Sequence, residues 1–259
     1  MGDPLDMSGQ VVIVTGGTRG IGRGIATRFL DAGAEVVVCG RKQPEELPDG
    51  GGREAAFVEA DVREVDHIDR VVSYTADRFG RLDVLVNNAG GSRSSPAAEA
   101  SPRFSAAIIA LNLIAPLNFS QRANAVMQDQ PDGGAIVNIA SVSGVRPSPG
   151  AAAYGAAKAG LLNLTQTLAV EWGPKVRVNA VTAGLIRTEL SHLYYGDESG
   201  IAAVGATVPL GRMGEPSDVA AACLFLASPL ARYVSGSSVT VHGGGERPAY
   251  LDVATPSPE

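Results

Sequence analysis

The sequence predicts an α/β protein with a doubly wound, mainly parallel seven-stranded sheet and helices on both faces. Short runs rich in β-branched residues alternate with segments of helical hydrophobic spacing along the chain of 259 residues, an alternation typical of parallel strands joined by crossover helices. Neither an internal repeat nor a shift in composition divides the chain. We therefore expect residues 1–259 to form a single domain.

The first forty residues predict a strand–helix–strand unit. Residues 10–15 form a β-branched run typical of a strand that is buried on both faces. Residues 21–32 have helical spacing and end at Gly33, a helix-stop residue, and residues 35–39 form the next strand. Because such crossovers are right-handed, the two strands are expected to be parallel, as in a Rossmann-like fold.

The rest of the chain continues this alternation. Residues 43–53, rich in proline, glycine and acid, predict a loop, and Pro116 predicts a kink or break in a long helix over residues 104–127. Residues 185–207 lack clear periodicity and are expected to form a substrate lid, and residues 247–259 a C-terminal tail. Further strands are predicted at residues 57–59, 84–86, 135–139, 176–181 and 238–241, and helices at residues 65–79, 154–172 and 217–227.

Composition excludes several functional classes. The formal net charge is −6 and no basic block occurs, which argues against nucleic-acid binding. No apolar run reaches the ~18 residues of a membrane span, and the acidic N-terminus does not resemble a secretory signal, so a cytoplasmic protein is expected. Cys39 and Cys223 are expected to be reduced core thiols. The three histidines lack ligand spacing, so no metal site is predicted.

A glycine-rich turn, residues 16–22, follows the first strand. Glycines permit positive φ and close approach to a pyrophosphate, and the following helix offers free N–H groups at its N-terminus. The spacing is GxxxGxG, which departs from GxGxxG, and an ordinary strand–helix turn is the alternative. The position after the first strand of an α/β pattern favours a dinucleotide site.

The end of the second strand bears on the choice of cofactor. It carries no carboxylate for the ribose hydroxyls of NAD. Arg41 follows the strand and Arg19 lies in the glycine-rich turn, and two guanidinium groups suit a 2′-phosphate. We expect NADP(H) to be favoured, with NAD(H) possible as a cofactor; the alternative is that both arginines are solvated surface charges.

Tyr154 and Lys158 are four residues apart, so on a helix they share one face. A free tyrosine has a pKa near 10, and a nearby ammonium lowers it. Lowering it to about 7 takes about 4 kcal/mol, so we expect the oxidised nicotinamide to contribute beyond Lys158. The alternative is a surface tyrosine beside a solvated lysine.

Three further polar residues are candidates for the same site. Ser141 follows the predicted strand at residues 135–139 and is placed to hold a substrate oxygen, with Ser143 as a rival. Asn112 lies among apolar residues of the predicted long helix. It is either a satisfied core amide or part of a polar relay behind Lys158.

Together these motifs resemble the short-chain dehydrogenase/reductase family, in its form of about 250 residues. Residues 15–22 look like its TGxxxGxG motif and residues 87–90 like its NNAG motif. Ser141, Tyr154 and Lys158 stand at the family spacing. The likeness covers roughly residues 8–245 and implies a nicotinamide-dependent oxidoreductase.

The resemblance implies a role for each site residue. Tyr154 would donate or accept the proton, Lys158 would bind the nicotinamide ribose and lower the tyrosine pKa, Ser141 would orient the substrate oxygen, and Asn112 would hold a water. The implied cofactor contacts are Gly16, Thr18, Arg19, Gly20, Ile21, Gly22, Arg41, Asp61, Val62, Asn88, Ala89, Gly90, Tyr154, Lys158, Gly184, Ile186 and Thr188. Family members assemble as homotetramers or homodimers through long helices, so the same is expected here.

The expected reaction is reversible hydride transfer between NADP(H) and a carbonyl or secondary alcohol, a 3-oxoacyl compound or another ketone. A cofactor-binding sensor or scaffold is the alternative, and isomerase or lyase use of the site is a third. The substrate contacts predicted are Ser141, Ser143, Tyr154, Leu190 and Tyr194. Leu193, Tyr195 and Ile201 are apolar pocket candidates that instead pack into the lid in the alternative interpretation, and Val145 and residues 92–95 are candidate walls.

The chain also departs from the family pattern. Ala183-Gly184 stands where Pro-Gly is usual, and His242 stands where an acid is usual. The segment between the second and third strands is short and rich in proline and glycine, so the helix usual there is expected to be reduced or absent.

Overall fold

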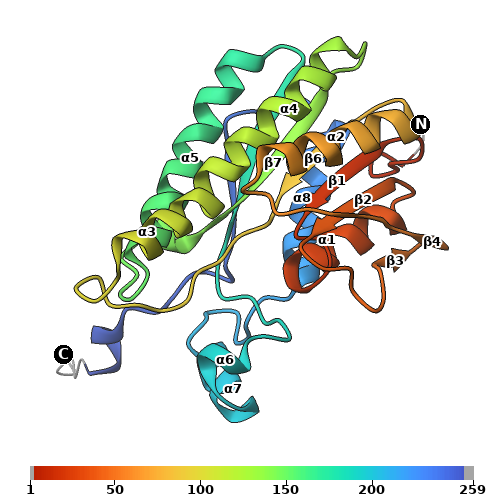
Figure 1. Cartoon of the computed structure of the whole chain (residues 1–259). Helices are drawn as coiled ribbons and strands as arrows, with labels where there is room; N and C mark the ends of the chain where they lie inside the picture. Colours follow the sequence, from red (N-terminus) through yellow and green to blue (C-terminus); the bar gives the residue numbers. More distant parts are fainter. Residues whose placement is uncertain (1–2, 254–259) are drawn as a thin grey trace.

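The computed structural model describes residues 3–253 and is built on a seven-stranded sheet with the order β5-β2-β1-β6-β7-β8-β9 (Figure 1). Every pair of neighbouring strands in it is parallel. The strands are β1 (Val11–Thr15), β2 (Glu35–Gly40), β5 (Ala56–Glu59), β6 (Val84–Asn87), β7 (Gly134–Ser141), β8 (Val176–Ala183) and β9 (Ser238–Val241). The predicted fold class is confirmed.

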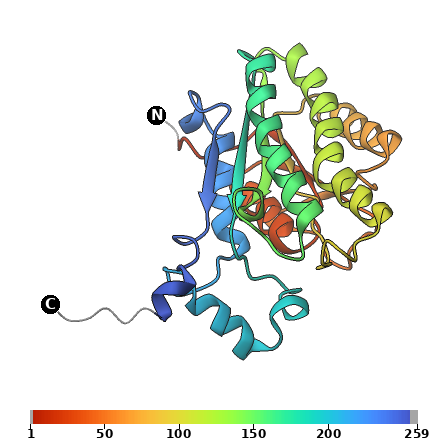
Figure 2. The same cartoon turned by 90° about the vertical axis from the view of Figure 1, so that its left-hand side faces the viewer.

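Helices cover both faces of this sheet, with α1 and α8 on one side and α2, α4 and α5 on the other (Figure 2). The helices are α1 (Gly20–Asp31), α2 (Val65–Phe79), α3 (Pro102–Ile109), α4 (Ala115–Asp129), α5 (Ala152–Trp172), α6 (His192–Tyr195), α7 (Glu198–Ala206) and α8 (Pro216–Ala227). Short 3-10 turns occupy Val142–Gly144, Pro229–Ala231 and Ala249–Asp252.

The strand order reverses its direction between β1 and β6. From β1 the chain moves outward through β2 to β5, and it then returns to β6 and proceeds the other way to β9. In an open parallel sheet, the loops at the carboxyl ends of the two central strands diverge at such a point and leave a crevice. The topology thus selects one end of the sheet as the place for a ligand.

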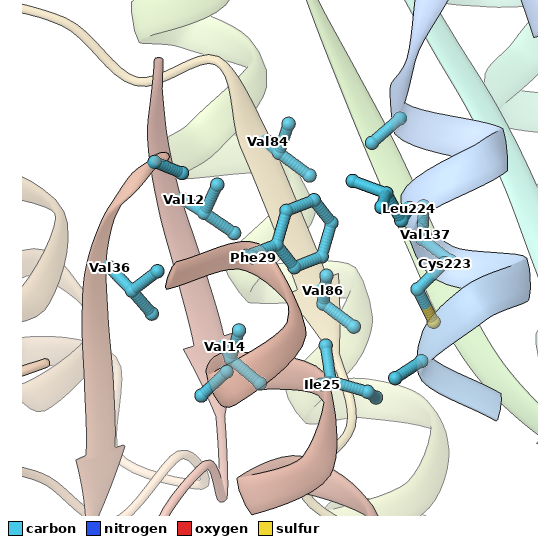
Figure 3. Packing of buried hydrophobic residues seen from close by; sticks show 14 of the residues in the cluster. Val12, Val14, Ile25, Phe29, Val36, Val84, Val86, Val137, Cys223 and Leu224 are labelled. Carbon is cyan, nitrogen blue, oxygen red and sulfur yellow. The ribbon is translucent and has the colours of Figure 1, made fainter. Parts of the chain in front are cut away.

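The core beneath α1 and α8 is filled mainly by aliphatic side chains. Figure 3 shows Phe29 and Ile25 of α1 lying against Val14 and Val86 of the central strands, with Cys223 of α8 beside them. Continuous runs of buried β-branched residues suit strands that are covered on both faces. Both cysteines are buried and free, as predicted.

The segment between β2 and β5 differs from the predicted loop. It contains a short antiparallel hairpin, β3 (Asp49–Gly50) with β4 (Arg53–Glu54). Gly51 and Gly52 form its tip with φ of 56° and 74°, the two positive values that a type I′ hairpin turn requires. Within the described residues this segment contains no helix, in agreement with the prediction of a reduced or absent one.

The predicted long helix is interrupted where proline predicts a break. A π-helical turn, Ala110–Ile114, joins α3 to α4, and Pro116 lies in the first turn of α4. Proline has no N–H to donate to the carbonyl four residues back, which here belongs to Asn112. By length and composition alone, the helical run Pro102–Asp129 is apolar enough to cross a membrane, but Phe119 of α4 is fully buried against the sheet, as in a core helix.

Residues 185–207 are more regular than their sequence predicts, because they contain α6 and α7. Asp197 caps α7, its carboxylate accepting hydrogen bonds of 3.1 Å from the amides of Ser199 and Gly200. An aspartate at this position is a helix-start signal. Hydrophobic periodicity misses the two helices because they are short and lie largely on the surface.

Candidate active site

A cleft of about 1160 Å³ opens at the carboxyl end of the sheet, above the switch point between β1 and β6. Loops that follow β1, β2, β5, β6, β7 and β8 form its walls. The predicted cofactor contacts and the five predicted substrate contacts line this cleft, whereas Asn112 lies behind its wall. Residues far apart in the chain are therefore gathered at one site.

The turn after β1 is packed too closely for side chains. A Cβ atom on Gly22 would lie 2.3 Å from the Gly16 carbonyl oxygen and 2.4 Å from Nδ2 of Asn88. Asn88 holds the turn by donating hydrogen bonds to the carbonyls of Thr15 (2.9 Å) and Gly16 (3.2 Å). The TGxxxGxG and NNAG motifs are thus two halves of one cradle.

The first turn of α1 faces this cradle with free amides. Its N-cap residue, Arg19, makes no side-chain capping bond, so the orphan N–H groups and the positive end of the helix dipole remain available to an anion. Thr188, in the loop after β8, lies over the cradle, with its Cγ2 atom 3.4 Å from where a Cβ of Gly20 would stand. This arrangement fits a dinucleotide pyrophosphate.

The end of the cleft formed by the loops after β2 and β5, where adenosine is expected, holds an ion pair that the sequence did not predict. Asp61 accepts hydrogen bonds from Arg63, one of them 2.9 Å long from Nε. These bonds hold the pKa of Asp61 at about 2, and the Arg41 charge contributes to the same effect. The Asp-x-Arg spacing was the available signal. Arg19, Arg41 and Lys42 line the same end.

Ser141 and Tyr154 meet at the floor of the cleft. Strand β7 runs further than predicted, so Ser141 is its last residue instead of following it. Burial raises the pKa of Tyr154, a hydrogen bond with Ser141 opposes the rise, and the Tyr194 phenol adds to it. With its pKa raised above the ordinary value near 10, the phenol is protonated at neutral pH.

Lys158 is a buried cation on the same face of α5. Its Nζ atom donates a hydrogen bond of 2.6 Å to the carbonyl of Ile139 and lies 5.7 Å from the centre of the Tyr154 ring. Burial lowers the pKa of Lys158 to about 8, because a low-dielectric surrounding disfavours the charged form. The hydrogen bond thus fixes the ammonium beside the phenol, and its pKa lies near neutral pH.

Asn112 lies in the π-helical turn and is fully buried. Its side chain accepts a hydrogen bond of 2.9 Å from the Gly91 amide and donates bonds to the carbonyls of Gly91 (3.0 Å) and Ile108 (2.9 Å). A Cβ on Gly90 would lie 2.7 Å from Oδ1 of Asn112 and 3.4 Å from Nζ of Lys158. The Asn112 side chain thus ties the loop after β6, which carries the NNAG motif, to the π-helical turn, at a point next to Lys158.

The substrate end of the cleft is more polar than expected. Ser143 accepts a 2.9 Å hydrogen bond from the hydroxyl of Ser148, which itself accepts a 3.2 Å bond from Arg146. Sequence reasoning missed Arg146, although its place between Ser141 and Tyr154 was a signal. Leu190, Tyr194 and Tyr195 line the cleft, as do Ser92, Arg93 and Ser94 of the predicted wall. The remaining candidates do not line it: Ser95, Val145, Leu193 and Ile201.

Comparison of the sequence with known proteins identifies one family profile and several curated relatives. A family profile described as enoyl-(acyl carrier protein) reductase matches residues 16–246. The chain is 36% identical over 248 residues to a 3alpha-hydroxysteroid dehydrogenase of Mediterraneibacter gnavus, covering 92% of this chain and 97% of the relative. It is 37% identical over 244 residues to the 3-oxoacyl-(acyl-carrier-protein) reductase FabG of Chlamydia muridarum, covering 91% and 96%.

A solved structure agrees with these relatives. The ligand-free aldohexose dehydrogenase of Thermoplasma acidophilum has a TM-score of 0.86 at 33% identity, and the match covers 98% of this chain and 99% of the other. Fold, length and sequence thus agree over nearly the whole chain. The protein belongs to the short-chain dehydrogenase/reductase family, and its family activity is that of an oxidoreductase.

Proposed function

We propose that the protein transfers a hydride reversibly between NADP(H) and a carbonyl or secondary alcohol, with a 3-oxoacyl compound or another ketone as the reducible substrate. The observation that carries the proposal is the meeting of Ser141, Tyr154 and Lys158 on the floor of a cleft whose other half is a glycine cradle. Relatives named as a hydroxysteroid dehydrogenase and a 3-oxoacyl reductase support this chemistry.

The proposed roles follow from the geometry. The Tyr154 phenol, protonated because burial raises its pKa, gives its proton to the substrate oxygen in reduction and takes it back in oxidation. The Ser141 hydroxyl orients that oxygen by a hydrogen bond. Lys158 holds a positive charge beside the phenol, and Asn112 keeps the NNAG loop in register. The nicotinamide ring supplies or takes up the hydride when the cofactor is bound.

NADP(H) is the cofactor that the charges favour. Arg19 and Arg41 line the adenosine end, and guanidinium groups bind a 2′-phosphate with bidentate geometry. The carboxylate at this end, Asp61, is already paired with Arg63. A paired carboxylate repels a phosphate less than a free one, so this end of the cleft suits the phosphorylated cofactor.

A cofactor-binding sensor or scaffold is the alternative, and the site itself argues against it. Burial of the Lys158 ammonium beside the Tyr154 phenol lowers the stability of the protein. A protein that only binds a nucleotide does not require such an arrangement. Isomerase or lyase use of the same residues predicts product formation without net consumption of NADPH. Both alternatives are separated from the proposal by one spectroscopic assay.

The assay follows NADPH absorbance with a panel of ketones and 3-oxoacyl thioesters. We expect turnover by the wild type, and a loss of 10³-fold or more in kcat, on the order of that for a general acid, in Tyr154→Phe. The variant should still bind NADPH, because the change removes a single hydroxyl and leaves the rest of the cofactor cradle intact. Activity that survives in Tyr154→Phe contradicts the assigned acid, and a wild type that oxidises no NADPH contradicts the reaction.

The lid, the assembly and the cellular location complete the proposal. Residues 185–207 act as the substrate lid of one domain, since Leu190 and Tyr194 line the cleft. A cytoplasmic homodimer or homotetramer is inferred from the acidic composition and the family membership. The tail predicted over residues 247–259 lies partly outside the described residues, at residues 254–259.

A further inference from the structure

The charge of the cleft is opposite to that of the protein. The chain carries a formal net charge of −6, yet the cleft is lined by seven lysines and arginines and by two carboxylates. A cleft lined by one sign of charge concentrates ligands of the other sign. The cofactor phosphates account for the cations at the adenosine end. They do not account for Arg93 and Arg146, which lie among the serines of the loops after β6 and β7.

Arg146 is tied to the residues of the proposed reaction. Its Nη1 atom donates a 3.2 Å hydrogen bond to Ser148, Ser148 donates a 2.9 Å bond to Ser143, and the Ser143 amide donates a 3.2 Å bond to Oγ of Ser141. A further 3.0 Å bond to the Pro147 carbonyl fixes the guanidinium. The cation therefore has a defined position relative to the hydroxyl that is proposed to orient the substrate.

A carboxylate from a distant part of the chain forms an ion pair with this guanidinium. Glu246, 100 residues away in sequence, pairs with Nη2 of Arg146. The side chains are 36% and 39% exposed, so the pair is only partly screened by water. Figures 1 and 2 show that the chain after β9 lies at the same end of the sheet as α6 and α7. An anion-binding position at the substrate end is thus filled by an internal anion.

We propose that Arg146 binds an anionic group, a carboxylate or a phosphoryl group, on the carbonyl substrate, and that this group displaces Glu246. The inference rests on the proposed function and adds to it the class of substrate. Arg93 lines the same wall and supplies a second positive charge. Bidentate hydrogen bonding to an oxyanion is the geometry for which arginine is suited.

The test compares anionic ketones with neutral counterparts that share the same carbonyl group. One series contains 3-oxobutanoate, 4-oxopentanoate, 5-oxohexanoate and 6-oxoheptanoate with their methyl esters, and the other contains dihydroxyacetone phosphate with dihydroxyacetone. We expect kcat/KM to be about tenfold or more higher for at least one anion than for its neutral counterpart, in line with a charge-assisted hydrogen bond. The two series distinguish a carboxylate from a phosphoryl substrate.

Two variants have opposite expected effects. Arg146→Gln should raise the KM of the preferred anion about tenfold to a hundredfold, whereas Glu246→Gln should lower it about two- to fivefold, the range for a partly exposed ion pair. In both variants the KM of the anion should change more than the KM of its neutral counterpart. If the pair were only a structural clasp, both variants would shift KM in the same direction and would affect neutral substrates equally.

A matched control is the ion pair between Asp69 and Arg122, which joins α2 to α4 outside the cleft with a 3.0 Å contact and similar exposure. Asp69→Asn should leave the ratio of anionic to neutral kcat/KM unchanged. Binding of each anion to the protein–NADP⁺ complex, measured by calorimetry, is independent of turnover. Neutral ketones reduced as well as or better than the anions overturn the inference and leave the proposed function standing. Anion binding that depends on Arg146 but is not accompanied by NADPH oxidation overturns the proposed function and leaves the anion site standing.

Discussion

The ammonium of Lys158 donates a 2.6 Å hydrogen bond to the carbonyl oxygen of Ile139, inside the protein and 3% exposed. The bond anchors α5 to strand β7 at the level of the reacting groups. One carbonyl replaces only part of the hydration that an ammonium has in water, and the pKa of Lys158 therefore falls to about 8. The site keeps its cation in place at a cost in stability.

Removal of this cation should make the protein more stable below about pH 8. The folded-state pKa of Lys158 is about 8 against a reference of 10.5, so the penalty of about 3 kcal/mol is fully present below the folded value and is relieved as pH rises toward the unfolded value. Lys158→Met should unfold at higher urea near pH 7, and its advantage should shrink above about pH 8.

The reference for this comparison is Lys175→Met, which removes the ammonium of an exposed lysine. Urea titrations of the cofactor-free proteins between about pH 6 and pH 10 measure the difference. An advantage of Lys158→Met that stays constant with pH would contradict the assignment. The same variant should lose most of its kcat in the NADPH assay.

Substitution of Gly90 tests the contact between the NNAG loop and Asn112. A methyl group at this position would lie 2.7 Å from Oδ1 of Asn112, so the amide must move and its bond to Gly91 weakens. Gly90→Ala should lower the free energy of unfolding by about 1–3 kcal/mol and reduce kcat. Urea unfolding and NADPH oxidation measure the two effects.

The double variant Gly90→Ala/Asn112→Ala measures the interaction free energy between the two positions. Alanine at position 112 removes the atom that the new methyl group meets. The stability loss of the double variant should therefore be smaller than the sum of the losses of the two single variants. Additive losses would show that the two residues do not press on each other, contrary to the geometry.

The cofactor preference should depend on Arg41. This exposed arginine lines the adenosine end of the cleft and adds to the lowering of the Asp61 pKa. Arg41→Ala should reduce kcat/KM for NADPH about tenfold to a hundredfold, the scale of one or two charge-assisted hydrogen bonds, and should change the value for NADH little.

Arg28→Ala is the matched control, since Arg28 is an exposed arginine of α1 outside the cleft. It should leave the ratio of the two kcat/KM values at the wild-type level. Equal losses with NADPH and NADH in Arg41→Ala would show that Arg41 does not recognise the 2′-phosphate.

The stability of the scaffold should depend on Phe29. Its ring is fully buried between α1 and the central strands (Figure 3), so Phe29→Ala should cost about 3–5 kcal/mol. Phe225→Ala is the comparison, because that ring is 36% exposed and the expected cost is well below that of Phe29. Chemical denaturation with matched m-values measures both, and similar costs would contradict the assigned core.

Local patterns determined much of this protein. Runs of buried β-branched residues such as Val11–Thr15 and the helical spacing of Val65–Phe79 define their elements over single segments, and the positions of Tyr154 and Lys158 on one face require only a helix. The hairpin tip at Gly51 and the N-cap at Asp197 were also present as local signals, but proline-rich composition and short helix length concealed them.

The tertiary structure decided what depends on contacts between distant segments. The bond from Asn112 to Gly91 and the pairing of Arg146 with Glu246 join loops that meet only when the crossovers bring the strand ends together. Burial then set the charge state of the site, since the pKa of Lys158 depends on how much water the fold excludes. Sequence spacing determined which residues share a helix face, and the packing of the whole chain determined their surroundings.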